Sequence, residues 1–252
     1  MNFSGGQFVK EKKIRSVVRI ESGSERGFFL KRHYGGKAPT VTERLKSFFL
    51  NSGKEDARNE WEMTLLMASL GFPAPTVIAF GSSGEGKEEK SLTLTEEVID
   101  TQRASDFIPT LTFDKNGMDG VHEKRRIIRR LGSFAKKFHG LGLNHQDFYL
   151  VHFFLNQKTE DIFLMDLQRV CKRESPVWRW VRKDLAQFVF SAMRTDNFSR
   201  TDILRFTQAY LDKKESGFNS GEKIKIKSIL KKSMQISAHD AKLRERSKTE
   251  VL

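Results

Sequence analysis

Cysteine is nearly absent from this 252-residue sequence. Its one cysteine, Cys171, excludes an intramolecular disulfide and a cysteine-based metal site, which fits a reducing compartment. No segment approaches the roughly 18 consecutive apolar residues that a helix needs to span a bilayer. The first residues, Met1 to Lys13, lack the apolar core of a secretory signal. We therefore expect any contact with a membrane to be peripheral.

A glycine-rich phosphate loop is also missing, because the sequence contains no G-x-G-x-x-G motif. Gly23 and Gly27 lie in a turn that leads into the third predicted strand, one strand too late for such a loop. The segment from Lys10 to Lys13, between the first two predicted strands, is better placed and would hold phosphates through side-chain charge. A solvated charge run is the alternative for this segment.

Positive charge is in large excess. The 45 Lys and Arg residues outnumber the 32 Asp and Glu residues, which gives a net charge of +13. This surplus favours an anionic partner, such as a nucleotide, a nucleic acid or an anionic membrane surface. A hydrophobic content of 38% and a charged content of 31% indicate a globular chain, long enough for one domain or two small lobes.

The order of the predicted elements indicates an α+β fold of two lobes. Short runs of β-branched and aromatic residues predict strands at 7–9, 16–20, 27–34, 77–80 and 91–98, with one helix at 55–70. Helical periodicity predicts the later helices at 122–139, 177–193, 202–211 and 221–234, before a charged tail from 241 that we expect to fray. We divide the chain into an N-lobe, 1–98, and a mainly helical C-lobe, 99–252.

Two aspartates stand at the ends of a predicted hairpin. Asp147 precedes an apolar strand and Asp166 ends the next one, with a polar turn from Asn156 to Asp161 between the strands. Because a hairpin brings its ends together, we expect the two carboxylates to converge. They resemble the catalytic base and the metal-binding aspartate of the kinase fold. A loop cap is the simpler interpretation of Asp147. After Asp166, Leu167 and Gln168 replace the Phe-Gly of protein kinases, which makes an activation-loop switch doubtful.

Two histidines flank Asp147. His152 stands five residues later, where protein kinases carry a second metal-binding Asn. Imidazole is a poor Mg²⁺ ligand, so a hydrogen-bonded structural histidine is at least as good an interpretation. We interpret His145 as structural.

Lys31, on the third predicted strand, is a candidate for binding the α- and β-phosphates of a nucleotide. This role requires a carboxylate partner on the next helix. Glu60 and Glu62 both flank the apolar stripe of that helix, which we place at Met63, Leu66, Met67 and Leu70. Spacing does not choose between the two glutamates, and a solvent-facing lysine is the alternative for Lys31.

Five segments together resemble the bacterial lipopolysaccharide kinase family, the enzymes that phosphorylate heptose or Kdo sugars of the inner core. These segments are residues 29–35, 57–61, 145–152, 164–169 and 183–186 (FLKRHYG, ARNEW, HQDFYLVH, LMDLQR and KDLA). The resemblance is greater to the heptose kinases than to the Kdo kinases. It implies a protein-kinase-like fold, ATP, Mg²⁺ and a position at the cytoplasmic face of the inner membrane.

The resemblance also bears on individual residues. It favours Glu60 as the partner of Lys31 and makes His152 a normal family feature. We assign Asp147 as catalytic base, Asp166 as metal ligand with His152 as a second candidate, and Glu97 and Val98 to the adenine-facing hinge. Asp184 is expected to be a buried support for the catalytic loop.

We therefore predict an ATP-dependent kinase that acts on a lipopolysaccharide core sugar, most plausibly a heptose. One alternative is a kinase of the same fold that phosphorylates another small molecule or a protein. The other is a non-enzymatic, basic nucleic-acid-binding protein. Converging carboxylates at Asp147 and Asp166 argue against nucleic acid, because they repel phosphates unless a metal intervenes.

Overall fold

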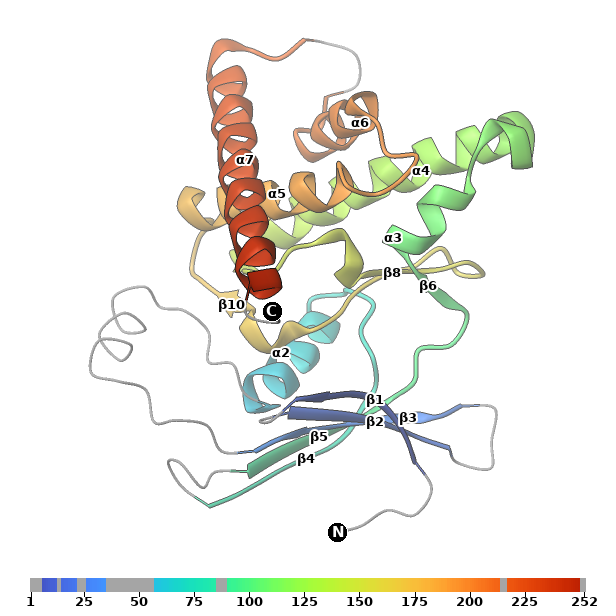
Figure 1. Ribbon diagram of the computed structural model, residues 1–252, viewed down its shortest axis with the longest axis vertical. Coiled ribbons are helices and arrows are strands. Elements are labelled where there is room, and N and C mark those ends of the chain that lie inside the picture. Colours follow the sequence, from blue (N-terminus) through green and yellow to red (C-terminus); the bar gives the residue numbers. More distant parts are fainter. Residues whose placement is uncertain are drawn as a thin grey trace. The chain divides into compact units, whose positions relative to one another are not determined.

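An antiparallel sheet of five strands lies in the amino-terminal part of the chain (Figure 1). The computed structural model describes residues 6–12, 15–21, 26–34, 57–84, 90–213 and 217–249. The sheet order is β1-β2-β3-β5-β4. Its strands are β1 (Gly6–Lys12), β2 (Arg15–Ile20), β3 (Phe28–His33), β4 (Val77–Ser83) and β5 (Lys90–Glu96). All five predicted strands are present.

Strand β1 is longer than predicted and includes part of the segment proposed as a phosphate loop. Lys10 pairs with Val17 and Lys12 with Arg15, so residues 10–12 lie in the ladder instead of a loop. The strand was predicted to end at Val9 because residues 10–12 are all charged and do not alternate with apolar residues. Backbone pairing with β2, which side-chain patterns do not reveal, extends the strand to Lys12. Lys13 lies outside the described residues.

Helix α2 (Ala57–Ser69) packs on this sheet. Of the predicted apolar stripe only Met67 is fully buried, while Met63, Leu66 and Leu70 are half-buried. The buried residues of the helix are Ala57, Glu60, Thr64 and Met67. Two of these are polar but satisfied: Glu60 is ion-paired, and the Thr64 hydroxyl donates to the Glu60 carbonyl over 2.6 Å. A pattern of apolar residues could not identify a face that is buried through polar contacts.

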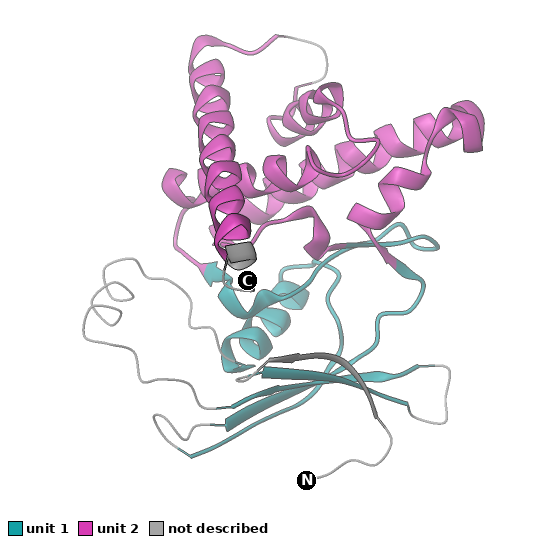
Figure 2. Ribbon diagram, viewed as in Figure 1, with its two compact units in different colours: residues 1–101, 154–171 teal, residues 102–153, 172–252 magenta. Residues whose placement is uncertain are grey.

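The chain forms two compact units (Figure 2). Unit 1 contains residues 1–101 and 154–171, and unit 2 contains residues 102–153 and 172–252. The first crossing between units lies close to the predicted boundary at 98/99. Residues 154–171, which include Asp166, belong to unit 1. The division of function between the lobes stays a prediction.

Short strands and single turns surround the points where the chain passes between the units. They form a three-stranded sheet, β6-β8-β9, and a two-stranded sheet, β10-β7. The predicted turn from Asn156 to Asp161, between β8 and β9, is present. Its Asn156 N–H donates to the Asp161 carbonyl over 2.9 Å. The elements are β6 (Thr101–Arg103), β7 (Leu143–Asn144), η3 (Leu150–His152), β8 (Phe153–Asn156), β9 (Ile162–Leu164), η4 (Leu167–Arg169) and β10 (Cys171–Lys172).

Unit 2 is mainly helical. Its helices are α3 (Ala104–Phe107), η2 (Ile108–Thr110), α4 (Phe113–Gly140), α5 (Trp178–Ala192), α6 (Arg200–Tyr210) and α7 (Ser220–Thr249). Among the helices that the structure describes, none combines the length and apolarity that crossing a bilayer requires.

Two helix boundaries differ from the prediction. Helix α4 begins before residue 122, because the Thr112 side chain caps it and the chain passes Gly117 with a non-helical φ of 59°. Helix α7 continues to Thr249, so the expected fraying is wrong for residues 241–249, and residues 250–252 lie outside the described part of the chain. Strong helix formers fill this tail, and Asp240 pairs with both Arg194 and Arg244.

Aromatic side chains build the core of unit 2. Phe138, Phe148, Phe153 and Phe188 are each less than 2% exposed. Phe148 lies 5.6 Å from Phe138 and 4.9 Å from Phe153, measured between ring centroids. Since these rings come from α4, the loop after β7, β8 and α5, the core fixes the loop that carries Asp147.

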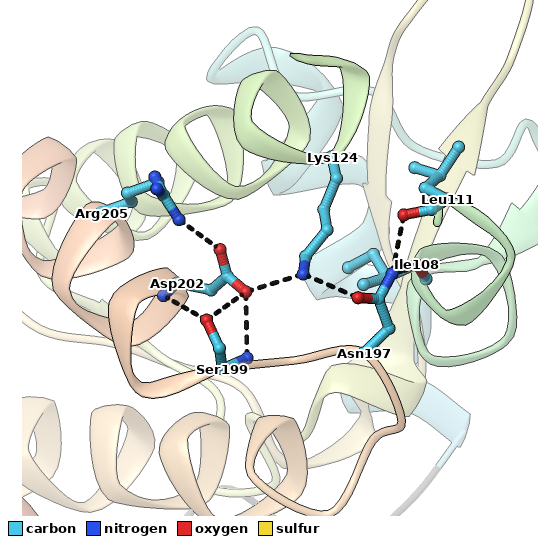
Figure 3. A network of polar contacts seen from close by, with 7 residues as sticks. All are labelled: Ile108, Leu111, Lys124, Asn197, Ser199, Asp202 and Arg205. Carbon is cyan, nitrogen blue, oxygen red and sulfur yellow. Dashed lines mark hydrogen bonds and ion pairs between the residues drawn. The ribbon is translucent and has the colours of Figure 1, made fainter. Parts of the chain in front are cut away.

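A buried polar network joins Lys124 of α4 to the start of α6 (Figure 3). The Asp202 carboxylate, on a residue that is 1% exposed, accepts hydrogen bonds from the Ser199 N–H and hydroxyl. It also pairs with Lys124 at 2.9 Å and Arg205 at 2.7 Å. Burial raises the pKa of Asp202, but Lys124 and Ser199 outweigh burial and lower that pKa overall. Charge pairing therefore stabilises the entry into α6.

Candidate active site

Lys31 and Glu60 form an ion pair between β3 and α2 in unit 1. In the β3–β5 register Lys31 lies opposite Thr93, whose hydroxyl donates to the Ala57 carbonyl over 3.1 Å. Directly opposed residues share one face of a sheet, so Lys31 is on the face that α2 covers. The strand and the helix thus fix a lysine whose side chain is only 21% exposed.

The structure chooses between the two glutamates that the sequence left open. Glu60 is 7% exposed and shares the buried face of α2 with Thr64 and Met67. Glu62 is exposed. The ion pair of Lys31 is therefore with Glu60, as the family resemblance implied.

Asp166 occupies a left-handed backbone conformation at the end of the β9 segment, with φ 62° and ψ 53°. Such a conformation is uncommon for a residue other than glycine and often marks a functional site. Its carboxylate is 30% exposed, and Oδ1 lies 3.9 Å from Arg15 Nη1. The following turn, η4, buries Gln168, so Gln168 occupies an ordered helical turn.

Polar contacts hold this turn in unit 1. The Asn59 side chain on α2 donates to the carbonyls of Gln168 and Val170 over 2.8 and 3.1 Å. Arg15 Nη1 donates to Gln168 Oε1 over 2.7 Å. No sequence pattern predicted roles for Arg15 and Asn59, although Asn59 precedes Glu60 in one of the family segments. Together they position the segment that carries Asp166.

The predicted hinge residues follow β5. The Glu97 carboxylate accepts a bifurcated hydrogen bond from Arg19 Nε, at 3.0 and 3.1 Å to its two oxygens, and a second one of 2.8 Å from Nη2. It also accepts the Gly27 N–H over 3.2 Å. The hydrogen bonds from Arg19 lower the pKa of Glu97 despite its burial. The Val98 carbonyl accepts the Thr101 hydroxyl over 2.8 Å. The side chain of Glu97 therefore braces the sheet, so an adenine contact at this position would use backbone groups.

Asp184 anchors the loop before Asp147 in unit 2. This residue of α5 has no exposed surface. Its Oδ2 accepts the His145 N–H over 2.6 Å, and its Oδ1 accepts the Gln146 N–H over 2.9 Å. Gln146 itself has a left-handed φ of 66°. The two charge-assisted hydrogen bonds hold an unfavourable backbone conformation directly before Asp147, which is the structural role that the sequence predicted for Asp184.

Two further residues on the same face of α5 hold the loop. Gln187 Nε2 donates to the Gln146 carbonyl over 2.7 Å, and Gln187 Oε1 accepts the Phe148 N–H over 3.1 Å. Ser191 Oγ accepts the Leu150 N–H over 2.8 Å. Neither Gln187 nor Ser191 was predicted from the sequence. Their spacing from Asp184, three and seven positions, places all three on one helix face and is the signal that could have found them.

The loop leaves Asp147 open to solvent while it buries its neighbours. Residues 142–146 and Phe148 are buried, whereas Asp147 is half-buried. The Asp147 N–H donates to His145 Nδ1 over 3.2 Å, so Nδ1 acts as an acceptor and the proton of a neutral His145 lies on Nε2. His145 is fully buried and stacks on His152 at 5.7 Å between ring centroids. This geometry fits a structural His145 beneath a fixed carboxylate.

A buried histidine and tyrosine lie next to the anchor. His139 Nε2 is 3.4 Å from Asp184 Oδ2, without the alignment of a hydrogen bond. His139 Nδ1 and the Tyr210 hydroxyl are 3.2 Å apart. Burial, together with the charge of Asp184, raises the pKa of Tyr210 well above its ordinary value. Neither His139 nor Tyr210 was predicted from the sequence to have a role.

Carboxylate oxygen is the donor that Mg²⁺ prefers, and the half-exposed carboxylate of Asp166 supplies it. Mg²⁺ bound with a nucleotide keeps several waters and phosphate oxygens, so few protein ligands are needed. Among the described residues no group of three or more His, Cys, Asp or Glu side chains could enclose a metal ion. The carboxylate of Asp166 suits a metal ion that is shared with phosphate oxygens. A role for His152 as a metal ligand stays a prediction. The convergence of Asp147, in unit 2, with Asp166, in unit 1, also stays a prediction.

Comparison with known proteins identifies the family. The profile of the lipopolysaccharide kinase (Kdo/WaaP) family matches residues 4–210. The chain belongs to this family. It is therefore a phosphotransferase of the class predicted from the sequence.

Individual relatives agree with this assignment. The chain is 28% identical to a lipopolysaccharide core heptose(I) kinase WaaP of Escherichia coli, over 96% of this chain and 89% of the relative. It is also 28% identical to the WaaP kinase of Pseudomonas aeruginosa, over 81% of this chain and 76% of that protein. A solved structure of WaaP in complex with acyl carrier protein covers 91% of this chain and 88% of its own, with 24% identity and a TM-score of 0.65. The predicted α+β, kinase-like fold is confirmed.

Proposed function

We propose that this family member transfers the γ-phosphate of ATP to a hydroxyl of a heptose in the lipopolysaccharide core. Its relatives in E. coli and P. aeruginosa carry the name heptose(I) kinase and match most of their length to this chain. The observation that carries the proposal is the anchored loop, in which Asp184 fixes the two backbone groups before Asp147. A fixed carboxylate open to solvent suits an acceptor that must enter from outside.

Asp147 acts as the general base in this proposal. It orients the acceptor hydroxyl and takes its proton as phosphoryl transfer proceeds. Because Gln187 and Ser191 fix the backbone on either side, the carboxylate needs little reorganisation before it reacts.

Lys31 binds the nucleotide phosphates, and Glu60 holds the lysine in position. A buried carboxylate neutralises part of the charge of Lys31 and restricts its rotamers, so the ammonium group is directed before ATP arrives. Glu97 and Val98 are proposed to line the adenine site through their backbone. Of the segment Lys10 to Lys13, residues 10–12 are part of β1.

Mg²⁺ would be held by Asp166, with His152 as a second candidate ligand. When bound, Mg²⁺ neutralises charge that develops on the transferring phosphoryl group. Arg15, whose Nη1 is 3.9 Å from Asp166 Oδ1, restrains the carboxylate from the side of β2.

We also propose that the protein works in the cytoplasm, in peripheral contact with the inner membrane. The acceptor is an anionic glycolipid, and the net charge of +13 favours an anionic surface. The outer face of α4 supplies basic side chains for this contact, among them Arg125, Arg129 and Lys136. The basic segment 37–54, which the sequence also suggests for this contact, lies outside the described residues.

The test measures which acceptor gains phosphate. Purified protein, Mg²⁺ and γ-labelled ATP would be incubated separately with core lipopolysaccharide, free sugars and a protein mixture. Label that enters only the lipopolysaccharide, and within it a heptose, agrees with the proposal. Label on free sugars or protein alone would favour the other kinase alternative, and no transfer to any core sugar would refute the proposed activity.

A further inference from the structure

Helix α7 packs against α5 within unit 2 (Figure 1). A cationic pocket is formed by side chains of these two helices. Its volume is about 430 Å³. Arg182 of α5 and three lysines of α7 line it, and the remaining lining residues, Ser228 and Gln235, are uncharged; the lysines are Lys227, Lys231 and Lys232. We refer to it as the α5–α7 pocket.

The stretch of α7 that lines this pocket carries positive charge without acidic residues. From residue 223 to residue 235, α7 contains five lysines and no Asp or Glu. Four like charges around one hollow repel one another, which costs stability unless an anion reduces the repulsion. A lysine-rich face that served only solubility would not need to surround a pocket.

The side chain of Arg182 also indicates that the pocket binds an anion. Its Nη1 donates to Ser228 Oγ over 3.3 Å, which directs the guanidinium toward α7. Its Nε is buried and has no hydrogen-bond partner within the described part of the chain. Buried donors without an acceptor are rare in folded proteins and often mark the place of a bound ion or water. An anion bound between Arg182 and the lysines would offset the repulsion among them.

We propose that the α5–α7 pocket binds a phosphoryl group. The guanidinium fork matches phosphate oxygens in geometry, while lysines act as point charges around it. The pocket contains none of the residues assigned to phosphoryl transfer, and α7 lies beyond the residues that the family profile matches. The site is thus additional to the kinase centre, and its ligand is either a free phosphate compound or the headgroup of an acidic lipid.

The first arm of the test uses inorganic pyrophosphate as the probe. Thermal unfolding of the full chain would be followed with increasing pyrophosphate, against sodium chloride of matched ionic strength. A ligand that binds only the folded state raises the melting temperature by mass action. Arg182→Gln and Lys231→Gln should each weaken the response by about tenfold in concentration, as expected for one charge-assisted contact.

Lys223→Gln is the matched control, because Lys223 is an exposed lysine of α7 that does not line the pocket. It removes the same charge and should respond like the wild type. Lys31 is intact in all three variants, so a loss of response in Arg182→Gln and Lys231→Gln cannot arise from the nucleotide site. None of these readouts requires kinase activity, so failure of the proposed function and failure of this site are distinguishable.

The second arm uses co-sedimentation with vesicles of phosphatidylglycerol and phosphatidylcholine, and with vesicles of phosphatidylcholine alone. A pyrophosphate response that depends on the pocket assigns the site to free phosphate compounds. Binding to the anionic vesicles that depends on Arg182 and Lys231, without a pyrophosphate response, assigns it to lipid headgroups. The proposal is overturned if both variants match Lys223→Gln in both arms. A change in Arg182→Gln alone would also overturn it, since that result reflects only the packing of a half-buried side chain.

Discussion

Replacement of Asp184 with asparagine should release the loop that carries Asp147. Asp184 is fully buried, and its carboxylate accepts the backbone N–H groups of His145 and Gln146 over 2.6 and 2.9 Å. Asparagine has nearly the same volume but only one acceptor oxygen. One of the two amides therefore loses its partner, and the new NH₂ group faces a donor.

The size of the effect follows from these two bonds. A hydrogen bond to a charged acceptor contributes about 1.5–3 kcal/mol. Asp184→Asn should therefore lower the free energy of unfolding by about 1.5–3 kcal/mol and Asp184→Ala, which removes both acceptors, by about 3–6 kcal/mol. Phosphoryl transfer should fall roughly 100-fold per folded molecule, the effect expected when a catalytic group is displaced by about 1 Å.

The assay is hydrogen exchange of the amides in residues 143–150, together with chemical denaturation. A loss of about 1.5–3 kcal/mol in local stability corresponds to exchange that is roughly 10- to 100-fold faster. Asp202→Asn is the matched control. Asp202 is also buried in unit 2, but its partners are Ser199, Lys124 and Arg205 (Figure 3).

Both variants should lose stability, but only Asp184→Asn should expose the amides of His145 and Gln146 and lose activity per folded molecule. If the two variants showed the same exchange in residues 143–150, the anchoring role of Asp184 would be refuted. Full activity in a folded Asp184→Asn protein would separate loop anchoring from catalysis.

Three further predictions concern single contacts. Lys31→Met and Glu60→Gln should each lower kcat/KM for ATP by about 10- to 100-fold, because a charged contact with phosphate is lost or misdirected, whereas Glu62→Gln, at an exposed position, should be neutral. The pKa of Asp202 is lower in the folded state than its ordinary 3.8. The stability that its carboxylate contributes is therefore present above pH 3.8 and declines as pH falls through the folded-state pKa. Acid unfolding curves should show this decline in the wild type and not in Asp202→Asn. Tyr210→Phe should lower the free energy of unfolding by about 1 kcal/mol, because it removes the hydrogen bond between the Tyr210 hydroxyl and His139. The pKa of Tyr210 is raised in the folded state above its ordinary 10.0. The stability that Tyr210 contributes should therefore be lost as pH rises beyond 10.0, in the wild type and not in Tyr210→Phe. Equal alkaline unfolding of the two proteins would contradict the last prediction.

Sequence patterns identified the strands well, because β-branched and aromatic runs separated by turns carry their own signal. They failed for the buried face of α2, where Glu60 and Thr64 replace the apolar residues that a stripe requires. The same limit hid Gln187 and Ser191, since polar residues on a helix ordinarily face water. Gln187 and Ser191 bind backbone groups of a loop about 40 positions earlier in the sequence. Local sequence patterns do not show which residues such a loop contacts.

Candidate residues with a charged partner were easier to predict. The pairing of Lys31 with a glutamate of the next helix, and the support of the catalytic loop by Asp184, follow from the order of motifs along the chain. The roles of Arg15 and Asn59 could not be predicted in this way, because their partners near Gln168 are more than 100 positions away in sequence. Long-range polar contacts of this kind leave no local periodicity.

In the proposed reaction, Asp147 is the general base when phosphate passes from ATP to a core heptose. The most direct measurement is single-turnover transfer from γ-labelled ATP to purified core lipopolysaccharide, with tandem mass spectrometry to locate the phosphate. The wild type should label a heptose, and Asp147→Asn should be slower by about 100- to 10,000-fold, the range for loss of a general base, with unchanged ATP binding. Asp119→Asn, an exposed aspartate of α4, should be fully active. Transfer by Asp147→Asn at the wild-type rate, or phosphate on a sugar other than heptose, would contradict the account.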